Sequence, residues 1–193
     1  MSPILFIGLG NPGQAYEKTR HNAGWLAIDE LIKEWENPAV PTRWSAEKKL
    51  FGSLAKIRHL NHDCFFLKPN TFMNDSGQCV AAAVKWFLDE DPTQPDQDFR
   101  QVVILHDDLD LSLGKYKLQY QSGPKVHNGV NSVRQHLHSD KFWVARIGID
   151  TREGDRTIPG QAYVLQPFSG SELSTLRTSV KTLGEELAYT VLE

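Results

Sequence analysis

Cysteine is scarce in this chain, and its spacing excludes two kinds of site. The 193 residues include two cysteines, Cys64 and Cys79, which lack the CxxC spacing of zinc and redox motifs. Two cysteines are also too few for the disulfide framework of a small secreted protein. We therefore expect two structural thiols that pack as small apolar side chains.

Long apolar runs are absent as well. No stretch of about 18 apolar residues occurs, and the chain does not open with a basic segment followed by a long apolar one. The sequence therefore predicts neither a membrane-spanning helix nor a secretory signal, and a cytoplasmic protein is the default expectation. With 40% hydrophobic and 23% charged residues, we expect a single domain over residues 1–193 with a sizeable core.

A strong net charge is the third absence. The formal net charge is −3, so the surface as a whole is not suited to nucleic acid. The distribution is uneven, because residues 89–110 contain eight acidic side chains and one basic, whereas residues 115–156 contain eight basic and four acidic. The second region is suited to contact a polyanion, although two unevenly charged solvated surfaces explain the pattern equally well.

Apolar runs and helical spacing alternate along the chain. Helical patterns cover residues 23–35, 76–88, 127–138 and the segment after 169. Strand-like segments are found at 4–7, 51–57, 64–67, 102–105, 115–118, 142–149 and 162–165. This alternation predicts an α/β fold with one twisted, mixed sheet, partly parallel, and helices on both faces.

Four polar loops are expected to form one pocket. Residues 8–22 and the triplet His106-Asp107-Asp108 each follow a buried strand, while Asn74 and Asn128 immediately precede helices. In sheets of this kind the ligand crevice lies at the carboxyl ends of the strands. The chain can therefore bring side chains from distant segments to one edge of the sheet.

The first loop contains the pattern GxGxxG at residues 8–13. In a dinucleotide site the helix begins within this pattern and presents its N-terminus to a pyrophosphate. Here residues 19–22 intervene before the helical pattern starts, and the acidic residues about 20 positions on lie inside the helix. A dinucleotide site is therefore not favoured, and the glycines are better explained as shaping a turn.

His21 and the acidic triplet leave several roles open. His21 is in a polar loop, and an imidazole with a pKa of about 6.5 suits a general base if a carboxylate holds its other nitrogen. Asp107 is one candidate for that carboxylate. His106, Asp107 and Asp110 could instead bind a hard cation or form a solvated turn, and the residues alone do not separate these readings.

The loop at residues 70–77 offers an amide and an aromatic ring. Asn74 has the donors and the acceptor needed to hold a substrate carbonyl or an oxyanion. Phe72 is either a core residue or a platform for a nucleobase. Ser76 is better explained as a helix cap than as a nucleophile, because the chain has no GxSxG elbow. Asn128 is either a cap or an amide that faces a ligand.

Five motifs follow one another over residues 4–149: GLGNPG…Y…TRHNAG, KPNTFMNDSG, HDDLDL, HNG and ARIGI. Together they resemble the bacterial-type peptidyl-tRNA hydrolase family. The resemblance implies a single α/β domain that hydrolyses the ester between a peptide and the 3′ ribose of tRNA. It implies no metal, no organic cofactor, no obligate protein partner and a monomer.

Residue by residue, the resemblance makes His21 the base that activates water, Asp107 the group that orients it, and Asn11 the residue that distinguishes a blocked peptidyl group from a free amine. Residues expected to contact the substrate or the tRNA are Asn74, Asn128, Tyr16, Phe72, Lys117 and Arg146. Of these, Tyr16 and Phe72 are expected beside the 3′ terminal nucleotide, and Lys117 and Arg146 at the tRNA 5′ phosphate.

One loop departs from the family pattern. Residues 119–126 stand where family members carry a glycine-rich run, and we expect this bulkier loop to affect access to the pocket and the presentation of Asn128. It motivates a second hypothesis, a family member that binds RNA without turnover. A metal-dependent hydrolase that uses His106, Asp107 and Asp110 is the third.

Overall fold

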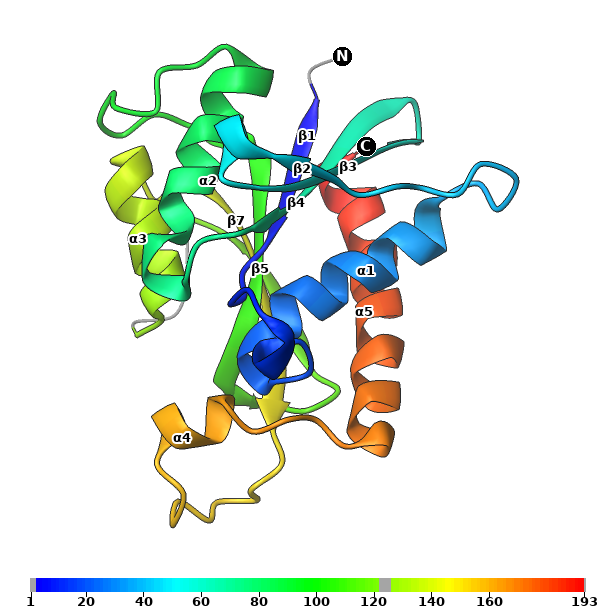
Figure 1. The fold of residues 1–193 in the computed structure, drawn as a ribbon, viewed down its shortest axis with the longest axis vertical. Coiled ribbons are helices and arrows are strands. Elements are labelled where there is room, and N and C mark those ends of the chain that lie inside the picture. The colour runs from blue at the N-terminus through cyan, green and yellow to red at the C-terminus, as the bar shows by residue number, and fades with distance from the viewer. Residues whose placement is uncertain (1–2, 122–125, 193) are drawn as a thin grey trace.

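A seven-stranded sheet in the order β2-β3-β4-β1-β5-β7-β6 runs through the computed structural model, which describes residues 3–121 and 126–192 (Figure 1). The strands are β1 (Ile4–Gly8), β2 (Ser45–Glu47), β3 (Gly52–His59), β4 (His62–Pro69), β5 (Phe99–Ser112), β6 (Tyr116–Tyr120) and β7 (Phe142–Asp150). The central strands β4, β1, β5 and β7 are parallel, and β2, β3 and β6 pair antiparallel at the two edges. The predicted mixed α/β sheet is confirmed.

Helices cover both faces of this sheet (Figure 1). Helices α1 (Ala23–Trp35) and α5 (Gly170–Val191) pack on one face, and α2 (Ser76–Ala83) and α3 (Asn128–Leu137) pack on the other. Strand β1 is buried along its whole length because it lies between two parallel strands and two helical layers. Its alternate side chains divide between the two cores: Phe6 stacks on Phe66 below α1, and Ile7 packs with the α2–α3 layer.

The contact between α1 and the sheet fixes the approach of the first loop to β5. A Cβ on Gly24 would lie about 2.6 Å from the backbone of Leu9 and would collide with the carbonyl oxygen of Leu105. Only glycine allows α1 to begin this close to the strands. Two short 3-10 turns, η1 (Gln14–Tyr16) and η2 (Arg20–Asn22), precede the helix, and η2 therefore lies beside β5.

Two predicted elements are wrong. Residues 162–165 were expected as a strand but belong to the short helix α4 (Gly160–Val164) and the residue that follows it; a short apolar run has no decisive period. The strand expected at 102–105, ending at His106-Asp107-Asp108, continues as β5 to Ser112. The polar triplet stays in register with β7, and His106 and Asp107 pair with Arg146 and Ile147.

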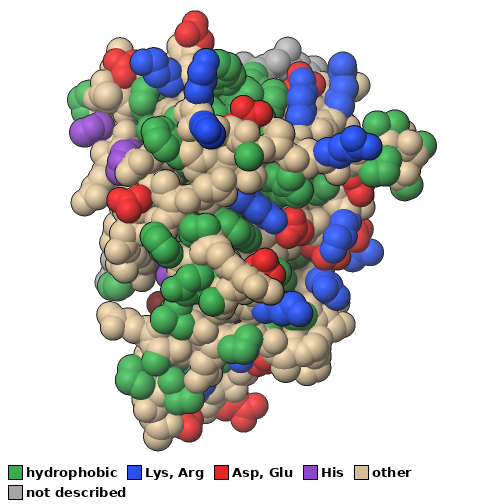
Figure 2. All heavy atoms as spheres, viewed as in Figure 1, with side chains coloured by type: hydrophobic (Ala, Val, Ile, Leu, Met, Phe, Trp, Pro, Cys, Tyr) green, Lys and Arg blue, Asp and Glu red, His purple; other side chains and the backbone are tan. Residues whose placement is uncertain are grey.

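Both cysteines are free and buried, as the sequence predicts. Burial raises the pKa of each thiol to about 12, so both stay protonated at neutral pH. Within the described ranges, no helix combines the length and apolar character that crossing a membrane requires. Figure 2 shows Lys and Arg side chains interleaved with Asp and Glu on the side where α1 and α5 lie, and these helices are joined by ion pairs such as Lys181–Glu34.

Candidate active site

Asp107 lies at the centre of a polar cluster on β5, two residues beyond the point where the neighbouring strand β1 ends. Its side chain, 3% exposed, accepts two hydrogen bonds on the same oxygen. His21 in η2 approaches Oδ1 through Nδ1 at 2.8 Å, and His127, just before α3, approaches it through Nε2 at 3.0 Å. Three segments that are far apart in the sequence therefore meet at one carboxylate oxygen.

The hydrogen-bond partners fix the tautomers of both histidines. Nδ1 of His127 accepts the backbone N–H of Val130 at 3.2 Å as the N-cap of α3, so the proton of His127 must be on Nε2, facing Asp107. His21 donates through Nδ1, and no described residue forms a hydrogen bond with its Nε2, whose lone pair is therefore open to a ligand. Of the two, His21 alone has the arrangement of a general base oriented by a carboxylate.

The electrostatics of the cluster reinforce this arrangement. Burial alone would raise the pKa of Asp107, but the electrostatic attraction and the hydrogen bonds of the His127 and His21 rings outweigh it and hold that pKa well below its usual range. Burial likewise opposes the charged form of His21, yet the Asp107 charge and hydrogen bond leave the His21 pKa raised. At neutral pH the aspartate is therefore ionised and attracts a proton to His21.

His106 supports the cluster from inside the sheet. It is fully buried, Nδ1 donates to the carbonyl oxygen of Asp107 at 2.6 Å, and its ring lies 4.5 Å from that of His127. Burial and the neighbouring His127 lower its pKa well below the ordinary value, so the ring is neutral. The described side chains that could share a metal ion are His21, Asp107 and His127, rather than the predicted set of His106, Asp107 and Asp110.

Asn11 is held rigidly beside this cluster. Its backbone N–H donates to Asn22 Oδ1 at 2.8 Å, and Asn22 Nδ2 donates back to the Asn11 carbonyl at 3.0 Å. The Asn11 Oδ1 accepts the backbone N–H of Met73 at 2.9 Å, so its oxygen is occupied. Among the described residues Asn11 Nδ2 has no partner, which leaves an N–H₂ donor for a ligand.

The predicted aromatic and amide side chains lie around the same loops. Phe72 is 59% exposed and meets the ring of Tyr16 edge-on, with the centroids 6.4 Å apart. Asn74 is exposed in the turn η4 (Met73–Asp75), and Asn128 is exposed as the first residue of α3. The turn η4 packs against α3, so these two amides come from neighbouring elements.

A family model described as peptidyl-tRNA hydrolase matches residues 5–193. The chain belongs to the peptidyl-tRNA hydrolase family. Relatives named peptidyl-tRNA hydrolase include one from Prochlorococcus marinus, 37% identical over 87% of this chain and 78% of the relative, and one from Synechococcus elongatus, 35% identical over 98% and 86%. The crystal structure of peptidyl-tRNA hydrolase from Acinetobacter baumannii superposes with a TM-score of 0.80 at 27% identity, covering 98% of this chain and 89% of that one.

The two basic residues that the family resemblance singled out are neighbours on the sheet. Lys117 on β6 and Arg146 on β7 are register partners, so their side chains project from the same face. Lys117 is exposed, whereas Arg146 Nε contacts Asp108 Oδ2 at 2.5 Å and its Nη1 donates to Gln119 at 3.1 Å. The charge of Arg146 is therefore matched by a buried carboxylate, and Lys117 is the more accessible cation.

The sequence did not indicate the contacts of three residues of this cluster: His127, which donates to Asp107, Asn22, which holds Asn11, and His106, which donates to the Asp107 carbonyl. Each adjoins a predicted site residue in the sequence, which was the only available signal. The predicted effect of the loop at 119–126 falls mostly on residues 122–125, which lie outside the described part of the chain.

Proposed function

We propose that the chain hydrolyses the ester between a peptide, or an N-blocked aminoacyl group, and the 3′ ribose of tRNA, by water activated at His21. The family match over residues 5–193 identifies the reaction. The observation that supports the mechanism is the hydrogen bond from His21 Nδ1 to Asp107, which leaves Nε2 as the base. The intact pair also disfavours the alternative of a family member that binds RNA without turnover.

In this mechanism His21 Nε2 takes a proton from water as the water oxygen attacks the ester carbonyl carbon. Asp107 stabilises the imidazolium that forms and keeps the ring in the productive tautomer. The imidazolium then returns the proton to the departing 3′ oxygen, so no covalent intermediate with the enzyme is needed. General-base assistance of this kind typically accelerates a reaction about 10²–10⁴-fold.

Asn11 is proposed to select substrates with a blocked amino group. Because Met73 occupies its Oδ1, the amide offers a donor rather than an acceptor. A donor pairs with the carbonyl oxygen of a peptidyl or acetyl group, and it cannot accept a hydrogen bond from a free ammonium. Asn74 and Asn128 are proposed to hold the substrate carbonyl as negative charge develops on it.

The tRNA is proposed to bind through stacking and phosphate contacts. Tyr16 and the exposed ring of Phe72 are suited to the terminal nucleotide, and Lys117 with Arg146 to the 5′ phosphate. These contacts read no base sequence, which suits a substrate class that includes many tRNAs. We further propose a single-domain, cytoplasmic monomer that requires no cofactor and no obligate protein partner.

Hydrolysis of N-acetyl-aminoacyl-tRNA tests the role of the base. We expect His21→Ala to lose at least about 100-fold in kcat, in line with the usual contribution of a general base. The matched control is His62→Ala, which changes the first residue of β4, at the strand end remote from the proposed site. This variant should keep wild-type activity. Wild-type kcat in His21→Ala would refute the mechanism.

A further inference from the structure

Arg20, the residue directly before the proposed base, is buried in a polar and aromatic slot. Its side chain is 7% exposed, and Nη2 donates to Glu172 at the start of α5 at 2.7 Å. The guanidinium carbon lies 4.6 Å from the ring centre of Tyr163 and 4.9 Å from that of Phe168. A planar guanidinium fits such a slot because it stacks on rings while its edge forms an ion pair.

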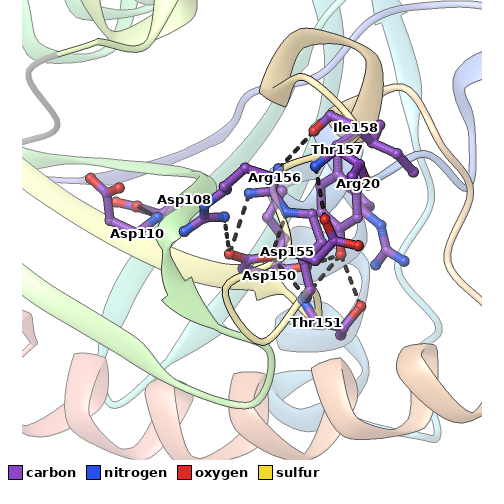
Figure 3. Close-up of polar contacts among 12 residues, drawn as sticks. Arg20, Asp108, Asp110, Asp150, Thr151, Asp155, Arg156, Thr157 and Ile158 are labelled. Atoms are coloured by element: carbon purple, nitrogen blue, oxygen red, sulfur yellow. Dashed lines mark hydrogen bonds and ion pairs between the residues drawn. The ribbon is translucent and has the colours of Figure 1, made fainter.

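The slot also holds the segment that follows β7. Arg152 lies over the Tyr163 ring at 4.3 Å, and the Tyr163 hydroxyl accepts the backbone N–H of Thr151 at 3.0 Å. The Thr151 hydroxyl donates to the same Glu172 oxygen as Arg20, at 3.2 Å. Figure 3 shows Arg20 beside this segment, in which Asp150 pairs with Arg156.

Backbone hydrogen bonds join the same two parts of the chain. Arg20 N–H donates to the Gln166 carbonyl at 3.0 Å, and Phe168 N–H donates to the Lys18 carbonyl at 2.9 Å. Thr19 and Pro167 form an isolated antiparallel bridge between them. Residues 18–20 are thus fixed to residues 166–168, and His21 is the next residue along the chain.

The burial of Arg20 carries a free-energy cost. Its Nε and Nη1 have no hydrogen-bond partner among the described residues, and unpaired buried N–H groups are destabilising. An apolar side chain of similar shape would avoid that penalty. The guanidinium provides instead a directional attachment: two ring faces and one carboxylate fix its position and hence the start of η2.

We propose that Arg20 is a positioning residue for His21: its clamp between Tyr163, Phe168 and Glu172 holds the turn η2 so that His21 Nδ1 stays on Asp107. The proposal rests on the proposed role of His21 as the base. It explains how a base that belongs to a short 3-10 turn, rather than to a strand or long helix, is held to the tolerance that catalysis needs, since a displacement of about 1 Å can cost roughly 100-fold in rate.

The test measures kcat, KM and the pH profile of N-acetyl-aminoacyl-tRNA hydrolysis in Arg20→Gln and Arg20→Lys. Arg20→Gln should lower kcat at least about 10-fold with KM within about twofold of wild type. The acidic limb of kcat should move to lower pH, because a His21 ring that leaves Asp107 loses the contact that raises its pKa, while His127 keeps the other Asp107 bond. Arg20→Lys keeps the charge and should recover part of both effects.

Two further variants separate positioning from general stability. Lys181→Gln removes a different ion pair of α5, the exposed one to Glu34 in α1, and it should leave kcat and the acidic limb unchanged. Glu172→Gln keeps the size of the side chain that pairs with Arg20, and it should lower kcat and move the acidic limb to lower pH as Arg20→Gln does. If Arg20→Gln does not fold, the result for Glu172→Gln tests the proposal. Unchanged kcat and acidic limb in the folded Arg20 or Glu172 variants, or equal shifts in Lys181→Gln, would overturn the proposal. His21→Ala, measured alongside, shows separately whether the base assignment stands.

Discussion

Replacing Asp107 by asparagine tests the electrostatic core of the site with the least change in shape. The introduced amide would keep an oxygen able to accept from His21 Nδ1 and His127 Nε2, so the fold should be retained. The variant removes the negative charge that faces the imidazolium formed during proton transfer. The expected loss is therefore in kcat, with KM for the tRNA substrate nearly unchanged, because the change affects the transition state rather than the phosphate contacts.

The size of this loss follows from the geometry. His21 Nδ1 lies 2.8 Å from the carboxylate oxygen, and an ion pair at about 4 Å between charge centres is worth about 4 kcal/mol at an effective dielectric constant near 20. Each 1.36 kcal/mol is about tenfold in rate, so we expect a fall in kcat on the order of 10³-fold. Without the Asp107 charge the His21 pKa should fall, so the acidic limb of the pH profile should also move to lower pH.

The assay is hydrolysis of N-acetyl-aminoacyl-tRNA across the neutral pH range, with Asp110→Asn as the control. Asp110 is an exposed carboxylate on the same strand, and its loss should leave kcat unchanged. Asp107→Asn with kcat close to that of wild type would refute the orienting role. Equal losses in both variants, reversed by adding a divalent cation, would instead support the metal-dependent alternative.

Two further predictions concern selection and tRNA binding. Asn11→Ala should lower the ratio of kcat/KM for N-acetylated over free aminoacyl-tRNA by up to about tenfold, as the loss of one hydrogen bond to a neutral carbonyl oxygen implies; an unchanged ratio would contradict its role in selection. Lys117→Gln should raise KM without changing Tm. It should also reduce the slope of the logarithm of the binding constant against the logarithm of the salt concentration by about one. Arg146→Gln should in addition lower stability by about 3–5 kcal/mol, because it leaves Asp108 buried without its partner; equal Tm values for both variants would contradict this distinction.

The sequence predicted the elements that local pattern determines. The apolar run at 4–7 and the helical period at 23–35 correspond to β1 and α1, because burial on both faces and on one face leave clear patterns. The extent of β5 could not be predicted in this way. His106 and Asp107 look like a solvated strand end, and Asp107 is buried in the ladder because His21 and His127 satisfy its carboxylate.

The same physical reason limited prediction of the site. His21, Asp107 and Asn11 stand in motifs, whereas the roles of His127 and Arg20 depend on partners far away in the sequence. Their chemistry is that of ordinary buried polar residues until the fold supplies those partners. The strand prediction for residues 162–165 was wrong for a related reason. Tyr163 in α4 is held by Thr151 and by stacked guanidinium groups, and such long-range contacts leave no periodic pattern in the local sequence.

One carboxylate oxygen with two imidazole donors requires that the two rings divide the work. Asp107 holds both at nearly equal distances, 2.8 and 3.0 Å, so proximity to the charge does not decide which ring acts as the base. The opposite nitrogens decide it. Nδ1 of His127 accepts the N–H of Val130 in α3, so that ring meets Asp107 as a donor through Nε2, whereas Nε2 of His21 has no hydrogen-bond partner among the described residues. The capping of helix α3 by His127 therefore supports the proposed assignment of His21 as the base, and in our proposal the contacts of Arg20 keep His21 in place.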